Sequence, residues 1–480
     1  MKLGMISLGC AKNLIDTEMF LGVARKYGIE ITNDMEEADI LVVNTCGFIE
    51  SAKKEAIDTI LELTDYGKKG KKVIAMGCLV ERYLDDLKES IPEVDFYFPM
   101  RDYKNIDKLF RQLTNSDSSY HMDYKNRVVS TLPHSAYLRI GDGCNNKCAY
   151  CAIPIIRGPF LSRPINDVIA EANILVNSGV KEITLIAQDT TRYGTDLNDG
   201  TTLVKLIKEL SKFDDLKVIR VLYLYPDEIT DELLEEFRDN EKLVPYFDIP
   251  IQHASNRILK LMNRRGSKEM ITKIINKLRS FIPDVIIRST LIVGFPTETD
   301  EDFNELYNFV KEIKFDRLGV FTYSKEEDTK AYDMKPEVSE IIAKQRYNKI
   351  MKLQAKIIKE KNKETIGKVY KVLVDNYDFD KEKYISRSYA YAPDDVDGYI
   401  YIDSSTPLIP GEFYDVLITK ADVYDLEGVV VEVENEEKKT KAKEKKEVKE
   451  EVKEEPKVEE KAETPVQSTI EDISGQDTSV

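Results

Sequence analysis

Three cysteines crowded into one short segment constrain this chain more than any other feature. The segment GDGCNNKCAYC places Cys144, Cys148 and Cys151 in a C-x3-C-x2-C pattern, just after an apolar run that predicts a strand. Such a loop can wrap three corners of a cubane iron–sulfur cluster, which normally takes four thiolates. Three thiolates leave one iron open to a small ligand, as in catalytic metal sites. The segment therefore predicts a 4Fe–4S cluster with one exchangeable position.

A zinc site or free core cysteines are the alternatives for this segment. A structural zinc site needs four ligands, and no fourth Cys or His lies at zinc-finger spacing. The three histidines of the chain, His121, His134 and His253, are remote in sequence. We expect Tyr150, inside the motif, to shield the cluster as an apolar neighbour, with ordinary core packing as the alternative.

The other three cysteines, Cys10, Cys46 and Cys78, each close an apolar run, in LGC, NTC and MGC. The runs 3–8, 40–43 and 73–76 predict strands, and helical periodicity follows each one. Alternating strands and helices imply a parallel sheet, whose carboxyl edge is where open α/β sheets place their sites. The pattern therefore brings three thiols to one edge, for metal ligation or as buried structural thiols.

The hydrophobic pattern predicts an α/β chain of several domains. A second strand–helix series predicts a partial TIM-type barrel with strands at 136–140, 183–186, 219–223, 246–249, 286–292 and 317–321, and with helices at 166–177 and 268–281. A long helix at 339–363 leads to a small antiparallel β-barrel. The parts are expected at 1–113 (open parallel α/β sheet), 114–134 (polar linker), 135–365 (barrel and connecting helix), 366–435 (β-barrel) and 436–480 (disordered Lys/Glu tail).

Composition narrows the compartment and the partners. No apolar run is long enough to span a bilayer, and the N-terminus MKLGMISLGC shows no secretory pattern. Sparse cysteines in metal-like spacing suit a reducing compartment, so we expect a cytoplasmic protein without a membrane partner. The net charge is −17, and residues 366–435 alone hold 15 acidic and 6 basic side chains. This acidity argues against a general nucleic-acid binder.

Beyond the cysteines, several motifs resemble the methylthiotransferases of the radical S-adenosylmethionine superfamily. These are LSRP at 161–164, DIPIQHAS at 248–255, VGFPTET at 293–299 and a C-terminal barrel similar to a TRAM domain. Four more resemble the branch that modifies small-subunit ribosomal protein twelve: GCAKN at 9–13, RYGTDLNDG at 192–200, GVFTYSKEEDT at 319–329 and SRSYAYAPDDVDG at 386–398. The resemblance covers residues 1–434. It departs at Thr297, where many members have glycine.

The resemblance implies the cofactors and the reaction. Cys144, Cys148 and Cys151 would hold the radical 4Fe–4S cluster with S-adenosylmethionine on its open iron, and the other three cysteines an auxiliary 4Fe–4S cluster. The reaction would add a methylthio group to the β-carbon of an aspartate in ribosomal protein twelve. It would draw on a low-potential electron donor such as flavodoxin or ferredoxin. No general acid or base is nominated, because the cofactor carries the hard step.

Polar loop residues at the expected barrel mouth are candidates to bind the cofactor. Gln188 and Asp189 follow the second strand, Gln252 the fourth and Gly294 the fifth. A solvated loop position is the alternative for each, and the main candidates are Gln188, Gln252 and Gly294.

The choice of substrate rests on charge. An RNA-binding module needs a basic face, whereas an acidic barrel attracts a basic ribosomal protein. We expect Asp394, Asp395 and Asp397 to contribute to that attraction, and we expect no tRNA partner. A tRNA adenosine methylthiotransferase is the alternative enzyme. A metal-bearing RNA-binding scaffold is the alternative without catalysis.

Overall fold

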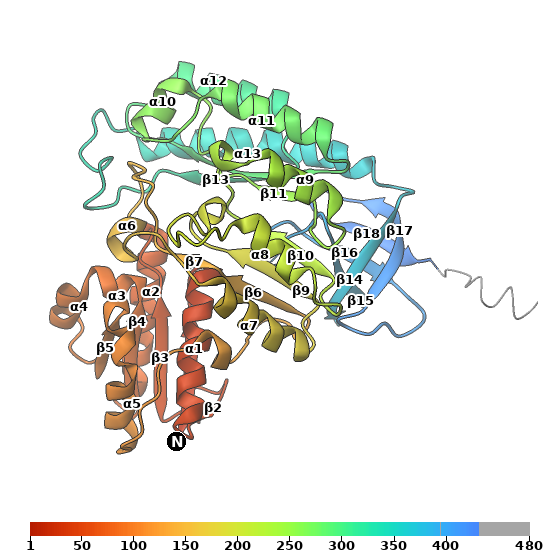
Figure 1. The fold of residues 1–480 in the computed structure, drawn as a ribbon. Helices are drawn as coiled ribbons and strands as arrows, with labels where there is room; N and C mark the ends of the chain where they lie inside the picture. The colour runs from red at the N-terminus through yellow and green to blue at the C-terminus, as the bar shows by residue number, and fades with distance from the viewer. Residues whose placement is uncertain (394, 432–480) are drawn as a thin grey trace, which may run out of the picture. The chain divides into compact units, whose positions relative to one another are not determined.

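The structure is a computed structural model that describes residues 1–393 and 395–431 (Figure 1). The chain divides into two units, Met1–Val431 and Glu432–Val480. The tail predicted at 436–480 lies outside the described residues. No helix in the described part of the chain is both long enough and apolar enough to cross a membrane.

The N-terminal part is a five-stranded, fully parallel sheet in the order β2-β1-β3-β4-β5. Its strands are β1 (Lys2–Ser7), β2 (Glu30–Ile31), β3 (Ile40–Thr45), β4 (Lys72–Gly77) and β5 (Phe96–Pro99). One core cluster joins a face of the sheet to α1 (Ala11–Lys26) and α5 (Ile106–Thr114). Another joins the opposite face to α2 (Glu50–Gly67), α3 (Cys78–Arg82) and α4 (Leu84–Ser90). The three predicted strands and their parallel order are confirmed.

The polar segment 114–134 comes after α5 in sequence and lies against α1, to which it is bonded. Val128 donates its N–H to the carbonyl of Glu18 at 2.9 Å, and Arg127 forms ion pairs with Glu18 and with Glu171 of the next domain. All three charged side chains of this group are buried. Charge pairing therefore orders a segment that looks unpatterned in sequence.

The central part is a partial barrel built from two parallel three-stranded sheets, β6-β9-β10 and β11-β12-β13. A parallel bridge between Ile219 and Leu243 joins the two sheets. The strands are β6 (Ser135–Arg139), β9 (Glu182–Ile186), β10 (Val218–Val221), β11 (Tyr246–Asp248), β12 (Ile286–Val293) and β13 (Arg317–Thr322). All six predicted strands are confirmed, and β13 forms an edge of the sheet.

Amphipathic helices cover the barrel from outside. They are α7 (Ile165–Asn177), α8 (Leu203–Leu210), α9 (Asp231–Asp239), α10 (Asn256–Leu261), α11 (Lys268–Phe281), α12 (Asp300–Ile313) and α13 (Glu340–Lys363). One apolar cluster joins these helices to the strands. The short pair β7 (Gly141–Asp142) and β8 (Leu161–Ser162) and the helix α6 (Ile153–Ile156) frame the loop that carries the cysteine motif.

The C-terminal part is a closed five-stranded barrel in the order β14-β15-β16-β18-β17. Its strands are β14 (Val369–Asp378), β15 (Lys383–Ser388), β16 (Ile400–Asp403), β17 (Phe413–Ala421) and β18 (Leu426–Val430), drawn in blue in Figure 1. The antiparallel prediction holds except for β16 and β18, which pair in parallel. The long chain between these two strands allows that pairing.

The C-terminal barrel packs against the N-terminal ends of the central strands. Arg387 pairs with Glu182, the first residue of β9, at 2.8 Å. Asp397 accepts a hydrogen bond of 2.6 Å from the hydroxyl of Tyr246, the first residue of β11. The segment SRSYAYAPDDVDG therefore helps to close the end of the barrel opposite the mouth, and leaves the carboxyl ends of the strands open for chemistry.

Candidate active site

Three thiols meet at the carboxyl edge of the N-terminal sheet, as the sequence predicts. Cys10 caps α1 after β1, Cys46 follows β3, and Cys78 opens α3 directly after β4. The backbone of Gly9 has a left-handed φ of 92°, and a Cβ there would lie 2.9 Å from Cβ of Cys46. Glycine therefore allows the Cys10 and Cys46 loops to approach each other.

Asn13, the last residue of GCAKN, ties the three cysteine loops together. Its buried amide nitrogen donates to the carbonyls of Leu8, at 3.1 Å, and Thr45, at 2.9 Å. Its amide oxygen accepts from Cys78 Sγ at 3.2 Å. Each partner lies within two residues of one cysteine or is that cysteine. Asn13 is therefore a positioning residue for the whole set.

Burial disfavours the charged thiolate form of two cysteines in this set. Burial raises the pKa of Cys78 to about 12, although the nearby Arg157 guanidinium lowers it and the Cys10 and Cys46 thiols raise it. Burial also raises the pKa of Cys46. All six cysteines are free. A bound metal supplies the positive charge that deprotonates such thiols, so the donor set fits an iron–sulfur cluster.

The second set, Cys144, Cys148 and Cys151, lies on the loop between β7 and α6. Backbone hydrogen bonds fix this loop from both sides, since Ala149 donates to Met262 at 2.9 Å and accepts from Ala331 at 2.8 Å. Cys144 N–H donates to Gly158 at 3.1 Å. The loop is therefore preorganised by the α10 region and by the segment that follows β13.

Burial also governs the thiols of this loop. Burial raises the pKa of Cys151 to about 12, and the Cys148 thiol adds to the effect. Arg264 lies 3.9 Å from Cys148 Sγ and stacks over the ring of Tyr225. Tyr150 is half-buried in an apolar cluster with Ala149, Met262 and Phe295. This packing is compatible with either expectation for Tyr150.

Neither cysteine set has the close arrangement of ligands that a single metal ion needs. Across residues 1–393 and 395–431, no group of three or more His, Cys, Asp or Glu converges closely enough to hold a single metal ion. Within each set, however, the thiols are close enough to shift one another's pKa.

A buried arginine that the sequence analysis missed connects the two cysteine sets. Arg157 follows α6, and its Nη2 lies 2.8 Å from Asp16, 2.7 Å from Asn13 Oδ1 and 3.6 Å from Cys78 Sγ. Its Nη1 pairs at 2.9 Å with Asp142, two residues before Cys144. Burial alone would raise the pKa of Asp142, but the guanidinium groups of Arg157 and Arg139 outweigh it and lower that pKa to about 2.

Direct packing confirms that the two sets are neighbours. Cys78 forms a small buried cluster with Ala152 and Ile156, and Met100 packs against it. Ala152 and Ile156 belong to the segment that follows Cys151. The structure therefore brings the two sites together across the boundary between the N-terminal sheet and the barrel.

Gln188 and Asp189 lie at the mouth after β9. Gln188 donates to Asp142 at 2.7 Å, while its buried Oε1 has no hydrogen-bond partner among the described residues. Asp189 is fully buried and accepts from Asn146 of the cysteine loop at 2.7 Å. Gln188 therefore offers a free acceptor next to the loop, whereas Asp189 holds the loop in place.

Gln252 and Gly294 have backbone roles at the mouth. Gln252 adopts a left-handed φ of 71° and bridges in parallel to Leu291 of β12. The N–H of Gly294 donates to the carboxylate of Glu298, which also pairs with His253 at 3.5 Å and Arg346 at 3.3 Å. Glu298 was not predicted as a site residue, although it lies within VGFPTET.

The acidic cluster predicted at 394–397 is not an exposed patch, so that expectation is wrong in part. Asp397 is buried, bonded to Tyr246 and near Arg288 and Arg317, at 3.8 and 3.9 Å. Asp395 is exposed, and Asp394 lies outside the described residues. The sequence could not reveal that Asp397 neutralises cations at the base of the barrel.

Comparisons with known proteins agree with this architecture. Family models match for the radical SAM superfamily over residues 138–310, the uncharacterized protein family UPF0004 over 2–99 and the TRAM domain over 366–431. Among solved structures, the radical S-adenosylmethionine methyltransferase TsrM of Kitasatospora setae is similar in fold. Its TM-score is 0.52 at 10% identity, covering 69% of this chain and 76% of TsrM.

Two curated relatives illustrate the similarity in sequence. The ribosomal protein uS12 methylthiotransferase RimO of Acetivibrio thermocellus is 48% identical, covering 91% of this chain and 99% of the relative. The enzyme of the same name from Clostridium botulinum is 50% identical, covering 89% of this chain and 98% of the relative. At this identity and coverage, the chain belongs to the RimO family of radical SAM methylthiotransferases, whose chemistry requires a 4Fe–4S cluster and S-adenosylmethionine.

Proposed function

We propose that this protein transfers a methylthio group to the β-carbon of an aspartate in ribosomal protein uS12. The observation that carries the proposal is the 46–50% identity, over about nine tenths of the chain, to relatives that bear this activity in their name. The adjacency of two cysteine sets supports it, because transfer of sulfur to carbon needs both sites within reach of one substrate atom.

The ligands follow from the two cysteine sets. Cys144, Cys148 and Cys151 would hold the radical 4Fe–4S cluster, and Cys10, Cys46 and Cys78 a second, auxiliary cluster. When bound, these groups and S-adenosylmethionine supply hydrogen abstraction from an unactivated carbon and a transferable methylthio group. A flavodoxin or ferredoxin would provide low-potential electrons.

The protein's own residues position these groups and exclude water. Gln188 would accept a hydrogen bond from the amino group of S-adenosylmethionine through its free Oε1, with Asp142 fixing its amide nitrogen. The N–H of Gly294 is engaged by Glu298, so we propose that Gly294 and Gln252 act by shaping the mouth. Cys78, Cys144 and Cys148 are buried, which would limit the access of bulk water to a reactive centre, whereas Cys10 is exposed.

The observations do not favour the alternative tRNA enzyme. Eight curated relatives that are 46–50% identical to this chain all bear the name ribosomal protein uS12 methylthiotransferase RimO. The C-terminal barrel region, with its 15 acidic and 6 basic residues, is also unsuited to a phosphate backbone.

A reconstituted reaction tests the proposal. The anaerobically reconstituted enzyme, with S-adenosylmethionine, a sulfide source and a reductant, should add a methylthio group to one aspartate of purified uS12. Purified tRNA under the same conditions should gain none. Modification of tRNA with unmodified uS12 would contradict the proposal.

A further inference from the structure

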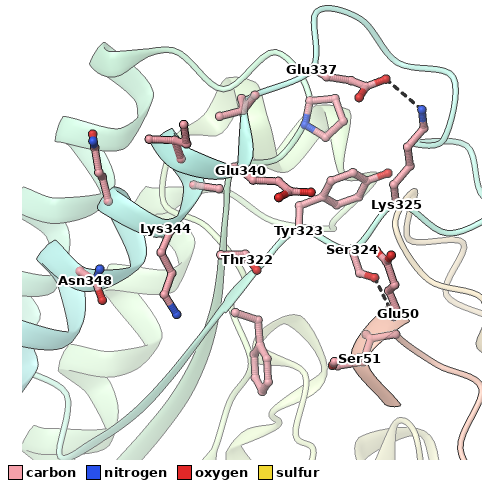
Figure 2. A pocket seen from close by; sticks show the side chains of 18 residues that line it. Glu50, Ser51, Thr322, Tyr323, Ser324, Lys325, Glu337, Glu340, Lys344 and Asn348 are labelled. Carbon is pink, nitrogen blue, oxygen red and sulfur yellow. Dashed lines mark hydrogen bonds and ion pairs between the residues drawn. The ribbon is translucent and has the colours of Figure 1, made fainter. Parts of the chain in front are cut away.

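A large cavity of about 1060 Å³ opens between the N-terminal sheet domain and the barrel (Figure 2). Its walls come from α2, β13 and α13, with the loop after β12 and the segment between β13 and α13, and Figure 2 shows side chains from α2, β13 and α13 turned toward it. Glu50 and Ser51 begin α2, Thr322 ends β13, and Glu340 begins α13. The cavity therefore lies where two domains meet the edge of the barrel sheet.

The edge of β13 that borders this cavity is free. Among the strands that the structure describes, β13 pairs only with β12. Tyr323 donates its N–H to Val293, at the end of β12, at 2.8 Å. Since N–H groups of successive strand residues point to opposite edges, the N–H of Thr322 points to the open edge. Phe321 and Thr322 are both exposed there.

An exposed strand edge with apolar neighbours is a template for another strand. Phe321 is 51% exposed and Ile341 of α13 is 72% exposed, and both line the cavity. Such residues offer pockets for alternate side chains of an extended chain, while the strand backbone offers hydrogen bonds.

The surroundings of this edge are acidic. A second cavity is lined by residues of the segment 327–333, which follows β13. Together the two cavities are lined by more carboxylates than lysines. The six carboxylates are Glu50, Glu327, Asp328, Asp333, Glu337 and Glu340, and the three lysines are Lys325, Lys330 and Lys344. Only Glu337 of the six forms an ion pair with a described residue. The unpaired carboxylates favour a basic occupant and disfavour a polyanion.

The same segment connects the edge to the reactive centre. After β13 the chain runs past Glu326, which is buried and pairs with Lys53 at 2.9 Å and Arg82 at 2.6 Å of the N-terminal domain. It then reaches Ala331, which donates to Ala149 between Cys148 and Cys151. A chain bound along β13 would therefore lie next to the segment that contacts the cysteine loop.

We propose that the free edge of β13 binds an extended, basic segment of the protein substrate as an additional strand and presents its target side chain to the cysteine sites. This inference rests on the proposed function, because it assumes a polypeptide substrate. The edge of β13 would bind the substrate at the mouth of the barrel. The C-terminal barrel, by contrast, packs at the opposite end of the strands.

Backbone-methylated peptides test the proposal without altering the enzyme. The probe is a synthetic uS12 peptide that spans the target aspartate, bound to the reconstituted holoenzyme with S-adenosylmethionine. In one version the odd-numbered residues of the peptide carry N-methyl groups, and in the other version the even-numbered residues do, so that each version blocks one of the two alternating sets (phases) of N–H groups. A strand uses the N–H groups of one phase only. One version should therefore bind about tenfold more weakly, as expected for two lost hydrogen bonds, and the other about as well as the parent.

Enzyme variants provide a second arm, with intact uS12 as the probe. Thr322→Pro removes an N–H from the open edge and should weaken uS12 binding about tenfold or more, while iron content stays unchanged. Glu340→Gln should weaken binding up to about fivefold. Glu232→Gln is the matched control, because Glu232 is also exposed in the first turn of a helix and lies outside the cavity. It should leave affinity unchanged.

The outcomes separate this proposal from the proposed function. Equal binding of the two methylated peptides contradicts docking on β13 even if the enzyme modifies uS12. Docking on β13 is also contradicted if the peptide fails to bind and Thr322→Pro leaves the affinity of the enzyme for intact uS12 unchanged. If tRNA binds at this edge instead, with affinity raised by Glu340→Gln, both proposals are wrong. Modification of uS12 with the predicted phase dependence supports both.

Discussion

At the scale of residues, Arg157 stands out because it neutralises two carboxylates between the two cysteine sets. Asp16, Asp142 and Arg157 were not predicted, and the pair of Arg157 with Asp16 joins residues 141 positions apart in sequence. Arg157→Leu would remove one of the two arginines that pair with the buried Asp16 and leave Arg139, at 2.7 Å, as the other. We expect the free energy of unfolding of the apo chain to fall by about 1–3 kcal/mol in a denaturant titration, because the buried carboxylates lose one hydrogen-bonded partner.

The pH dependence gives this prediction a second readout. The lowered pKa of Asp142 means that its pairing contributes stability above the unfolded value of about 4, and that the contribution is lost as pH falls toward about 2. The difference between wild type and Arg157→Leu should therefore shrink over this range. Arg157→Lys, which keeps the charge, should lose less stability than Arg157→Leu. Equal loss in both variants would show that packing, rather than charge, is what Arg157 supplies.

Thr297 shows how one departure from the family pattern acts on the backbone. Its φ of 70° is left-handed, a conformation that costs a β-branched residue about 1–2 kcal/mol relative to glycine. Thr297→Gly should raise the free energy of unfolding by about 1 kcal/mol. Thr297→Ala removes the hydroxyl that accepts from Arg257 but keeps the strain, so it should give no gain. A gain from alanine would contradict the strain argument.

At the scale of elements, the two cysteine sets sit on separate scaffolds, strand ends in one case and a single loop in the other. We expect about eight irons per reconstituted chain. Replacing Cys144, Cys148 and Cys151 by alanine should remove about half and abolish reductive cleavage of S-adenosylmethionine. Replacing Cys10, Cys46 and Cys78 should also remove about half, but cleavage should persist without methylthiolated product. Iron analysis and detection of 5′-deoxyadenosine distinguish the sets; cleavage by the first variant would contradict the assignment.

The elements themselves were largely predictable, and the contacts between them were not. The strands at β1, β3 and β4 follow from apolar runs that end in cysteine, and α11 begins and ends where its periodicity predicts. The segment 114–134 gave no such signal, because Arg127 is ordered by Glu18 and Glu171 from two different domains. Periodicity records local burial and carries no information about such distant ion pairs.

At the scale of the whole molecule, each cysteine set was predicted separately, and their adjacency was not predicted. Cys10, Cys46 and Cys78 follow from the carboxyl edge of a parallel sheet, whereas the other set follows from its spacing within one loop. Their adjacency, through Cys78 and Ile156, needed the packing between domains. The prediction for the acidic segment 394–397 was wrong in part because burial also depends on packing between domains. A count of charges cannot distinguish exposed Asp395 from buried Asp397.

The central claim is that this protein methylthiolates ribosomal protein uS12. Mass analysis of uS12 and of total tRNA, from cells with and without the gene, tests it most directly. We expect uS12 to lose the mass of one methylthio group in the deletion strain and regain it when the gene is restored. A gene with all six cysteines replaced by alanine should not restore it. Unchanged uS12, together with loss of methylthioadenosine from tRNA, would contradict the account.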